Sequence, residues 1–209
     1  MNSTVFKYLL LSFISILLSE LLKKTVYLDK LLYNSLAEQL TSKQIENLFE
    51  FKKKWQWINY VLPPILLLIK TSTITTILYI GLFFSNKDLK FNTILNIVLK
   101  AEFVFLFVPV FKIIWFYFFQ THYTLEDIQY FYPLSALNIT GYKGLEIWFI
   151  YPFQVLNLFE LLYIIYLGFE IGKLTQTNTD YGLKIIAFSY APSLLLWVAT
   201  VMFFTLNYA

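Results

Sequence analysis

The chain has 209 residues, of which 58% are hydrophobic, 21% aromatic and only 14% charged, and its mean hydropathy is +0.63. Average soluble domains carry more charge than this, so the composition indicates an integral membrane protein. The net charge of +3 comes from lysine alone, because the sequence contains no arginine. We expect no nucleic-acid binding, since no basic stripe lies outside the membrane-flanking clusters. The lack of cysteine excludes disulfides and thiolate chemistry.

Five apolar stretches are long enough to cross a bilayer, which takes roughly 20 helical residues. They are Val5–Leu22, Trp57–Phe84, Phe91–Phe119, Trp148–Phe169 and Lys184–Leu206. The first lacks a small-residue cleavage site and ends in a lysine pair, so we interpret it as an uncleaved anchor. Internal prolines predict kinks in the later spans. The sequence therefore predicts an all-α polytopic membrane bundle of about five transmembrane helices. Its parts are an N-terminal anchor (1–22), a cytoplasmic amphipathic helical hairpin (23–56) and a four-helix bundle (57–209).

The distribution of lysine predicts the orientation of these spans. The loop after the first span holds far more lysines than any other loop and ends in the basic cluster Lys52, Lys53 and Lys54. By the positive-inside rule this loop is cytoplasmic. Five spans then place the N-terminus outside and the C-terminus in the cytoplasm. A composition rich in lysine, asparagine, isoleucine and phenylalanine is typical of AT-rich bacterial genomes, so we expect a multi-pass protein of a bacterial inner membrane.

The cytoplasmic loop contains two amphipathic helical patterns. Leucines recur at helical spacing in "YLDKLLYNSLAEQL", and Thr41 with Gln44 forms a capping-box pattern before the second helix. Two interpretations of this hairpin stay open. It lies on the membrane with Lys52–Lys54 against anionic headgroups and Trp55 and Trp57 in the interfacial belt, or it is a docking site for a partner protein.

Four lysine and glutamate residues lie deep inside the predicted spans, where ionised side chains are costly, whereas Lys112 lies near the inner end of its helix and can snorkel to the headgroups. They are Lys70, Lys100, Glu102 and Glu160. At about 1.5 Å per residue, Lys70, Glu102 and Glu160 reach one layer of the membrane, with Lys100 close above it. Lys100 and Glu102 are two residues apart on a helix and point to opposite sides, so each needs another partner. We predict an interhelical polar network of these four residues. An ion path is the alternative, but the sequence has no intramembrane histidine, glycine-rich broken helix or internal repeat.

The segment 121–144 is a polar and aromatic loop with a capped helix start at Thr124. Such a surface suits a protein partner. The candidate interface residues are Tyr123, Glu126, Asp127, Tyr130, Phe131 and Tyr132. His122 lies beside two carboxylates, which is too small a ligand set for a durable metal site, so we expect no metal.

Motifs that carry chemistry are missing from the sequence. It has no nucleophile elbow, zinc-protease motif, phosphate-binding glycine loop or cofactor fingerprint. Ser189 and Ser193 have no histidine to activate them. We therefore expect neither an enzyme nor a cofactor.

The stretches "LNLFELLYIIYLGFEIGK" (156–173) and "YGLKIIAFSYAPSLLLWVATVMFF" (181–204) resemble the last two spans of Yip1-domain membrane proteins. The likeness covers roughly residues 57–206 and rests on span layout and a few aromatic and proline positions. It implies a small five-span, non-enzymatic membrane scaffold or adaptor, with no transferable site residues. The anchor at the front departs from the family, which usually begins with a soluble cytoplasmic segment.

These observations favour an accessory subunit or scaffold that binds membrane lipids and other integral membrane proteins in a hetero-oligomeric complex. An envelope or protein-export assembly is the setting that we expect. The alternative is a small permease or ion-coupled transporter that uses Glu102 and Glu160 with Lys70.

Overall fold

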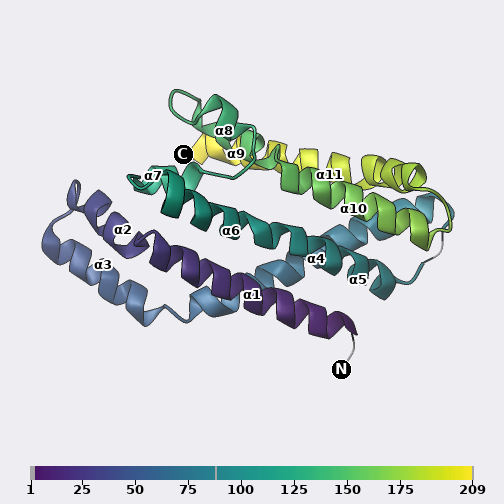
Figure 1. Ribbon diagram of the computed structural model, residues 1–209, viewed down its shortest axis with the longest axis horizontal. Helices are drawn as coiled ribbons and strands as arrows, with labels where there is room; N and C mark the ends of the chain where they lie inside the picture. Colours follow the sequence, from purple (N-terminus) through teal and green to yellow (C-terminus); the bar gives the residue numbers. More distant parts are fainter. Residues whose placement is uncertain (1–2, 88, 209) are drawn as a thin grey trace.

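The computed structural model describes residues 3–87 and 89–208, and the regular elements in these residues are all helical (Figure 1). The predicted all-α class is confirmed. In chain order the elements are α1 (Ser3–Thr25), α2 (Leu28–Ala37), α3 (Ser42–Lys54), α4 (Ile58–Phe84), α5 (Phe91–Ala101), the 3-10 helix η1 (Glu102–Leu106), α6 (Phe107–Ile114), the π-helix η2 (Trp115–Phe119), α7 (Leu125–Tyr130), α8 (Leu137–Thr140), α9 (Ile147–Val155), α10 (Leu158–Leu174) and α11 (Thr179–Tyr208).

Three helices in the described residues are long and apolar enough to cross a membrane. They cover Thr4–Thr25, Ile58–Phe84 and Thr179–Tyr208, and they correspond to the first, second and fifth predicted spans. The chain therefore has the character of a multi-pass membrane protein. Helices α4 and α11 remain continuous although each contains proline.

The third predicted span, Phe91–Phe119, is not one regular helix. It divides into α5, η1, α6 and η2. Pro109 has no backbone N–H and its ring crowds the carbonyl four residues earlier, which belongs to Phe105. The chain tightens into the 3-10 segment Glu102–Leu106 immediately before this proline. The break therefore falls where α-helical hydrogen bonding cannot be completed.

The fourth predicted span is interrupted between α9 and α10. The backbone of Asn157 is extended, and its side chain accepts a 2.8 Å hydrogen bond from the Glu160 N–H at the start of α10. Ser135 forms an isolated antiparallel bridge with Asn157, and the Ala136 N–H donates to the Leu156 carbonyl at 2.8 Å. The preceding loop thus supplies hydrogen bonds for backbone groups that the break leaves without helical partners.

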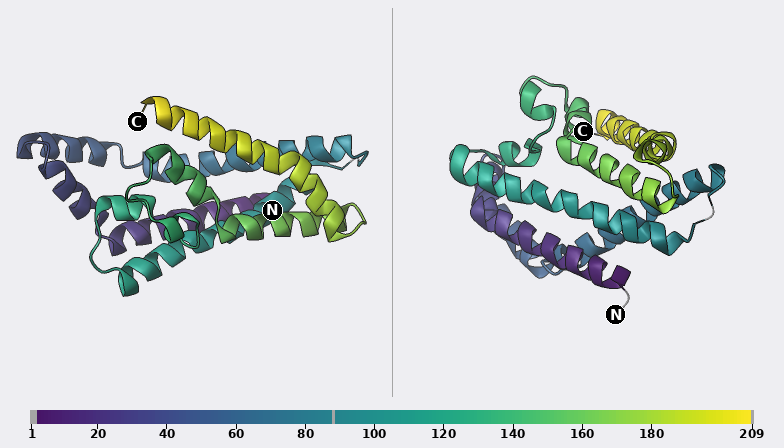
Figure 2. Two further views of the ribbon diagram at one scale, coloured as in Figure 1. Left: turned by 90° about the horizontal axis from the view of Figure 1, so that it is seen from above. Right: turned by 45° about the vertical axis from the view of Figure 1, so that its right-hand side comes forward.

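The segment α5–η1–α6 lies between α1 on one side and α10 on the other (Figure 2). Two polar contacts attach α1 to its neighbours. Tyr8 donates a 2.8 Å hydrogen bond to the Pro64 carbonyl on α4, and Lys7 donates a 2.6 Å hydrogen bond to Asn96 on α5. The main hydrophobic core joins α4, α5, α10 and α11. The first span is therefore part of the helical assembly.

The hairpin α2–α3 is held by contacts between its two helices. Lys52 pairs with Asp29 at 2.5 Å, and the rings of Tyr33 and Phe49 are 6.2 Å apart. Buried Ile45 adds an apolar contact. A small cluster of Val26, Phe116 and Ile128 attaches the base of the hairpin to η2 and α7. The hairpin, α7 and the C-terminal end of α11 gather at one end of the molecule (Figure 1).

The closest helix contact is between α10 and α11, and it depends on glycine. A Cβ on Gly168 would lie 2.6 Å from the Leu183 side chain, and one on Gly172 would lie 2.5 Å from the Asn178 carbonyl. A Cβ on Gly182 would meet the Gly168 carbonyl itself. Glycines spaced four apart let helix backbones approach closely in membranes. This interface fixes α10 against α11.

Replacing Gly182 by alanine should destabilise the protein. Alanine favours a helix over glycine by about 1 kcal/mol. The added methyl, however, would press on backbone, and overpacking costs typically about 1–3 kcal/mol. We expect Gly182→Ala to lower the free energy of unfolding by about 1 kcal/mol, measured by thermal denaturation in detergent. The control Ala187→Val enlarges an exposed position on the same helix and should leave the melting temperature nearly unchanged. Equal stability of both variants would contradict close packing at Gly182.

Candidate functional site

An ion pair joins α4 to η1 in the interior of the helices. The Lys70 Nζ lies 2.8 Å from Glu102 Oε2. The Glu102 side chain is only 3% exposed, whereas that of Lys70 is 44% exposed. The ammonium also lies 4.0 Å from the centroid of the Phe105 ring, a cation–π arrangement. Lys70 thus neutralises a carboxylate that is out of reach of water.

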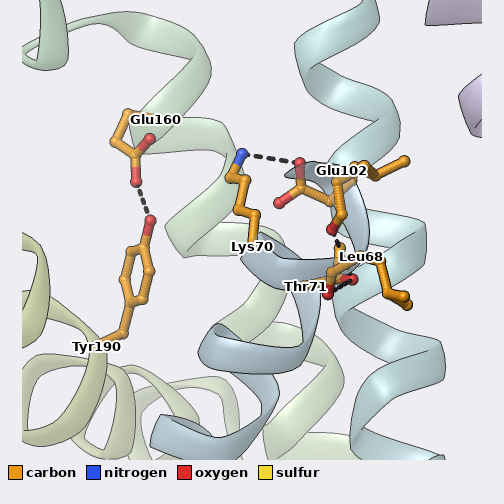
Figure 3. A network of polar contacts seen from close by, with 7 residues as sticks. Leu68, Lys70, Thr71, Glu102, Glu160 and Tyr190 are labelled. Carbon is orange, nitrogen blue, oxygen red and sulfur yellow. Dashed lines mark hydrogen bonds and ion pairs between the residues drawn. The ribbon is translucent and has the colours of Figure 1, made fainter. Parts of the chain in front are cut away.

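A second carboxylate lies on the other side of Lys70. Tyr190 on α11 donates a 2.6 Å hydrogen bond to Glu160 Oε1 on α10. Figure 3 shows the Lys70 side chain between Glu102 and Glu160, with its ammonium bonded to Glu102. Tyr163, fully buried on α10, connects the two halves: its ring lies 5.8 Å from the Tyr190 ring and its hydroxyl borders Glu102. We call Lys70, Glu102, Glu160, Tyr163 and Tyr190 the polar layer.

Two buried polar atoms of this layer have no hydrogen-bond partner among the described residues. They are Glu102 Oε1 and the Tyr163 hydroxyl oxygen. An unpaired buried donor or acceptor costs about 1–3 kcal/mol. The two atoms belong to neighbouring side chains, and a hydrogen bond from the Tyr163 hydroxyl to Glu102 would satisfy both.

Both helix interruptions place a carboxylate in the layer. Glu102 is the first residue of η1, and Glu160 lies in the first turn of α10 behind its Asn157 cap. A carboxylate in the first turn of α10 is favoured by the partial positive charge of that helix end. The breaks in the third and fourth segments therefore determine where the two acidic groups lie.

The structure separates Lys100 from the other predicted network residues. Its Nζ lies 3.8 Å from Glu170 Oε2 on α10, and this pair is independent of Lys70. Lys70 and Glu102 are brought together, and Glu160 lies opposite them with Tyr190 as its hydrogen-bond donor. The four predicted residues therefore form two separate groups. Lys70, Glu102 and Glu160 gather near the start of α10, and Lys100 pairs with Glu170 further along that helix.

Asp127 organises the loop of the predicted interface. Its carboxylate accepts hydrogen bonds from the Thr124 N–H at 2.7 Å and the Thr124 hydroxyl at 2.9 Å, which completes a capping box at the start of α7. Its second oxygen accepts a 2.7 Å bond from the Tyr142 hydroxyl. One carboxylate therefore links the beginning and the end of this loop.

These contacts alter the protonation equilibria of both partners. Partial desolvation would raise the pKa of Asp127, but the hydrogen bonds from Thr124 and Tyr142, together with nearby Lys143, hold it below its usual value. Desolvation and the Asp127 carboxylate raise the pKa of Tyr142 to about 12. Tyr142 is therefore a neutral donor to an ionised Asp127 at physiological pH.

The aromatic residues of the predicted interface pack within the protein. Tyr123 contacts Phe116 with ring centroids 5.0 Å apart, and Phe131 stacks on Trp115 at 5.2 Å. Tyr130 packs on the Tyr142 ring. Tyr132 is half-buried near Glu160, and burial first, then the charge of Glu160, raises its pKa to about 12. Of the six predicted interface residues, Glu126 is the exposed one.

The basic residues of the predicted membrane-surface cluster lie on the exposed surface of the protein. Lys53 and Lys54 are exposed, while Lys52 is held by Asp29. Phe51, Trp55 and Trp57 are exposed beside them at the junction of α3 and α4. In the part of the chain that the structure covers, no group of three or more His, Asp or Glu side chains could hold a metal ion.

Three residues of the site were not singled out from the sequence. Tyr163 follows Glu160 by three residues, so it shares a helix face with that carboxylate and could have been found by spacing. Tyr190 and Glu170 had no comparable signal, because their partners come from other helices.

Removing Lys70 should cost more than removing the charge of Glu102. Lys70→Met leaves a buried carboxylate without its counterion, which costs roughly 3 kcal/mol. Glu102→Gln leaves a half-exposed lysine, whose stem can turn its ammonium towards more polar surroundings. We expect the melting temperature in detergent to fall further in Lys70→Met than in Glu102→Gln.

The double variant Lys70→Met with Glu102→Gln is the matched control. It should be more stable than Lys70→Met alone, because no buried charge is left. Additive losses in the double variant would show that the two side chains do not interact.

Asp127 should make the loop sensitive to acid. Its folded pKa is lowered, so its contribution to stability is present above the unfolded value near 3.9 and is lost as the pH falls through the folded value. We expect Asp127→Asn to increase proteolytic cleavage within 121–144 at neutral pH and to remove the additional cleavage that wild type shows in acid. Glu126→Gln, a neighbouring exposed change, should behave like wild type. Unchanged cleavage of Asp127→Asn would contradict the link.

Comparison with protein-family models finds no match to this chain, and comparisons with curated proteins and with solved structures also find no match. The resemblance to Yip1-domain proteins therefore stays a prediction. The function has to be argued from the helices and from the polar layer itself.

Proposed function

We propose that the protein is a non-enzymatic accessory subunit or scaffold that binds other integral membrane proteins in a hetero-oligomeric complex. Its setting would be a bacterial inner membrane, in an envelope or protein-export assembly. The single observation that carries the proposal is the exposure of Lys70. This residue lies near the middle of the 27-residue helix α4, and its side chain is 44% exposed.

Lipid is a poor neighbour for such a group. A lysine at the centre of a transmembrane helix costs about 2.5–3.5 kcal/mol on translocon-insertion scales. The Glu102 carboxylate and the Phe105 ring lie against the Lys70 ammonium, and the side chain as a whole is still 44% exposed. A partner helix that presents a hydroxyl, amide or carboxylate at this depth would complete its hydrogen bonds. A protein neighbour therefore suits the outer side of Lys70 better than acyl chains.

The proposal includes five crossings, with the N-terminus outside and the C-terminus cytoplasmic. Segments α5–η1–α6 and α9–α10 would be the two broken crossings, which membranes tolerate where protein satisfies the freed backbone groups. The small cluster of Val26, Phe116 and Ile128 supports this topology, since it joins two loops that would both be cytoplasmic. The resemblance to Yip1-domain proteins supports a scaffold or adaptor role.

A small ion-coupled transporter is the second candidate, and the broken helices favour it. Transporters often bind ions and substrates where discontinuous helices meet at mid-membrane. Here Glu102 and Glu160 both lie directly after an interruption, with Lys70 between them. The same residues would then form part of a transport path.

Site-specific photo-crosslinking separates the two candidates. Leu66 is exposed one turn before Lys70 on α4, so a photoreactive residue there should crosslink to one membrane protein in intact cells. The same residue at Phe188, exposed on α11, is the control and should not give that product. We expect Lys70→Met to reduce the crosslink and the stoichiometric co-purification of that protein at least fivefold. Lys184→Met, at an exposed lysine elsewhere, should change neither.

A protein that purifies alone, with no crosslink from Leu66, would contradict the subunit proposal. Proton-driven or pH-dependent flux in liposomes that is lost in Glu160→Gln would then support the transporter.

A further inference from the structure

The charges of the polar layer do not balance. It contains two carboxylates, Glu102 and Glu160, and one ammonium, Lys70. Lys70 is bonded to Glu102, while the side-chain partner of Glu160 among the described residues is the neutral hydroxyl of Tyr190. The nearby Lys100 is engaged by Glu170 and does not serve either carboxylate of the layer. With both carboxylates ionised, the interior would hold one uncompensated negative charge.

Opposing influences act on Glu160. Burial and repulsion from Glu102 disfavour its charged form. The hydrogen bond from Tyr190 and the N-terminal end of α10 favour that form. The protonation of this one carboxylate therefore decides the net charge of the layer.

The ionisable groups that face Glu160 come from every element around it. They are Lys70 on α4, Glu102 on η1, Tyr163 on α10, Tyr190 on α11, Tyr151 on α9 and Tyr132 in the loop before α8. The tyrosines are neutral near pH 7. Lys70 and Glu102 are therefore the only charges in this set that oppose or favour ionisation of Glu160 there.

The Tyr163 hydroxyl adds a neutral polar group to the layer. It is fully buried and borders Glu102. Neither this hydroxyl nor Glu102 Oε1 has another hydrogen-bond partner among the described residues, so a hydrogen bond between the two side chains is the one that would satisfy both.

We propose that the polar layer is a one-proton site on Glu160, and that Lys70 responds to its occupancy. With the proton bound to Glu160 Oε2, Tyr190 donates to Oε1 and Lys70 pairs with Glu102, as in the structure. When the Oε2–H bond breaks and the proton leaves to solvent, the Lys70 ammonium becomes shared between both carboxylates. The site thereby links the side chain of Lys70 on α4 to the protonation of Glu160 on α10. The inference requires no partner protein and does not rest on the proposed subunit function.

Infrared difference spectroscopy of the full chain in lipid nanodiscs tests the site. Between about pH 6 and pH 9, exposed carboxyl groups with pKa values near 4 stay ionised, so they do not contribute a carboxylic-acid carbonyl band. We expect wild type to show one such band per chain at the lower end of this range and to lose it as the pH is raised further. Glu160→Gln should lack the band, and the control Glu170→Gln, on the same helix but outside the layer, should retain it.

Lys70→Met provides a second test that does not alter the proton-binding group. Without the ammonium, Glu160 loses its nearest favourable charge. The band that Glu160→Gln removes in the Lys70→Met background should therefore persist to a pH at least one unit higher, a tenfold change in proton concentration, and this comparison separates it from any band of Glu102. A wild-type protein without a carboxylic-acid band in this range, or a band that persists in Glu160→Gln, would overturn the proposal.

Discussion

A buried carboxylate needs a counterion, and much of this structure follows from how Glu102 obtains one. Glu102 lies at the start of a 3-10 segment and receives the Lys70 ammonium from α4. Neither residue could reach the other unless α4 and η1 packed side by side with Phe105 beneath the ammonium. The Lys70 side chain also lies between Glu102 and Glu160, so α4 supplies the cation that faces carboxylates of both η1 and α10 (Figure 3). In a low-dielectric interior such a contact constrains helix positions more strictly than apolar packing does.

Helix α10 is the element on which the polar contacts converge. It carries Glu160 and Tyr163 in the polar layer and Glu170 in the pair with Lys100, while its Gly168 and Gly172 lie against α11. The polar and glycine contacts are complementary. The glycines bring α11 close enough for Tyr190 to reach Glu160, and the polar groups give the interface a defined register, which non-directional apolar contacts alone do not.

The sequence was informative wherever a local rule applied. Counting residues from the membrane surface placed Lys70 and Glu102 at the same depth, and the structure pairs them. The capping boxes expected at Thr41 and Thr124 both form. It failed where the outcome depends on distant segments. The break before Asn157 is completed by backbone groups of residues 134–136, and nothing near Asn157 encodes that contact. Likewise, nothing in the local pattern of 121–132 indicates that Tyr123 and Phe131 pack on Phe116 and Trp115 of η2, and the predicted interface itself stays a prediction.

The 3-10 segment has one more effect on how the chain is arranged. A 3-10 helix turns about 120° per residue and an α-helix about 100°, so five residues of η1 rotate the following helix by roughly 100° more than a continuous α-helix would. The inward faces of α5 and α6 therefore point in different directions. Helix α5 packs with α4, α1 and α10, whereas the main neighbour of α6 is α1. The segment α5–η1–α6 thus contacts different neighbours on its two sides. It holds the N-terminal helix α1 to the main hydrophobic core, to which α1 contributes no residue.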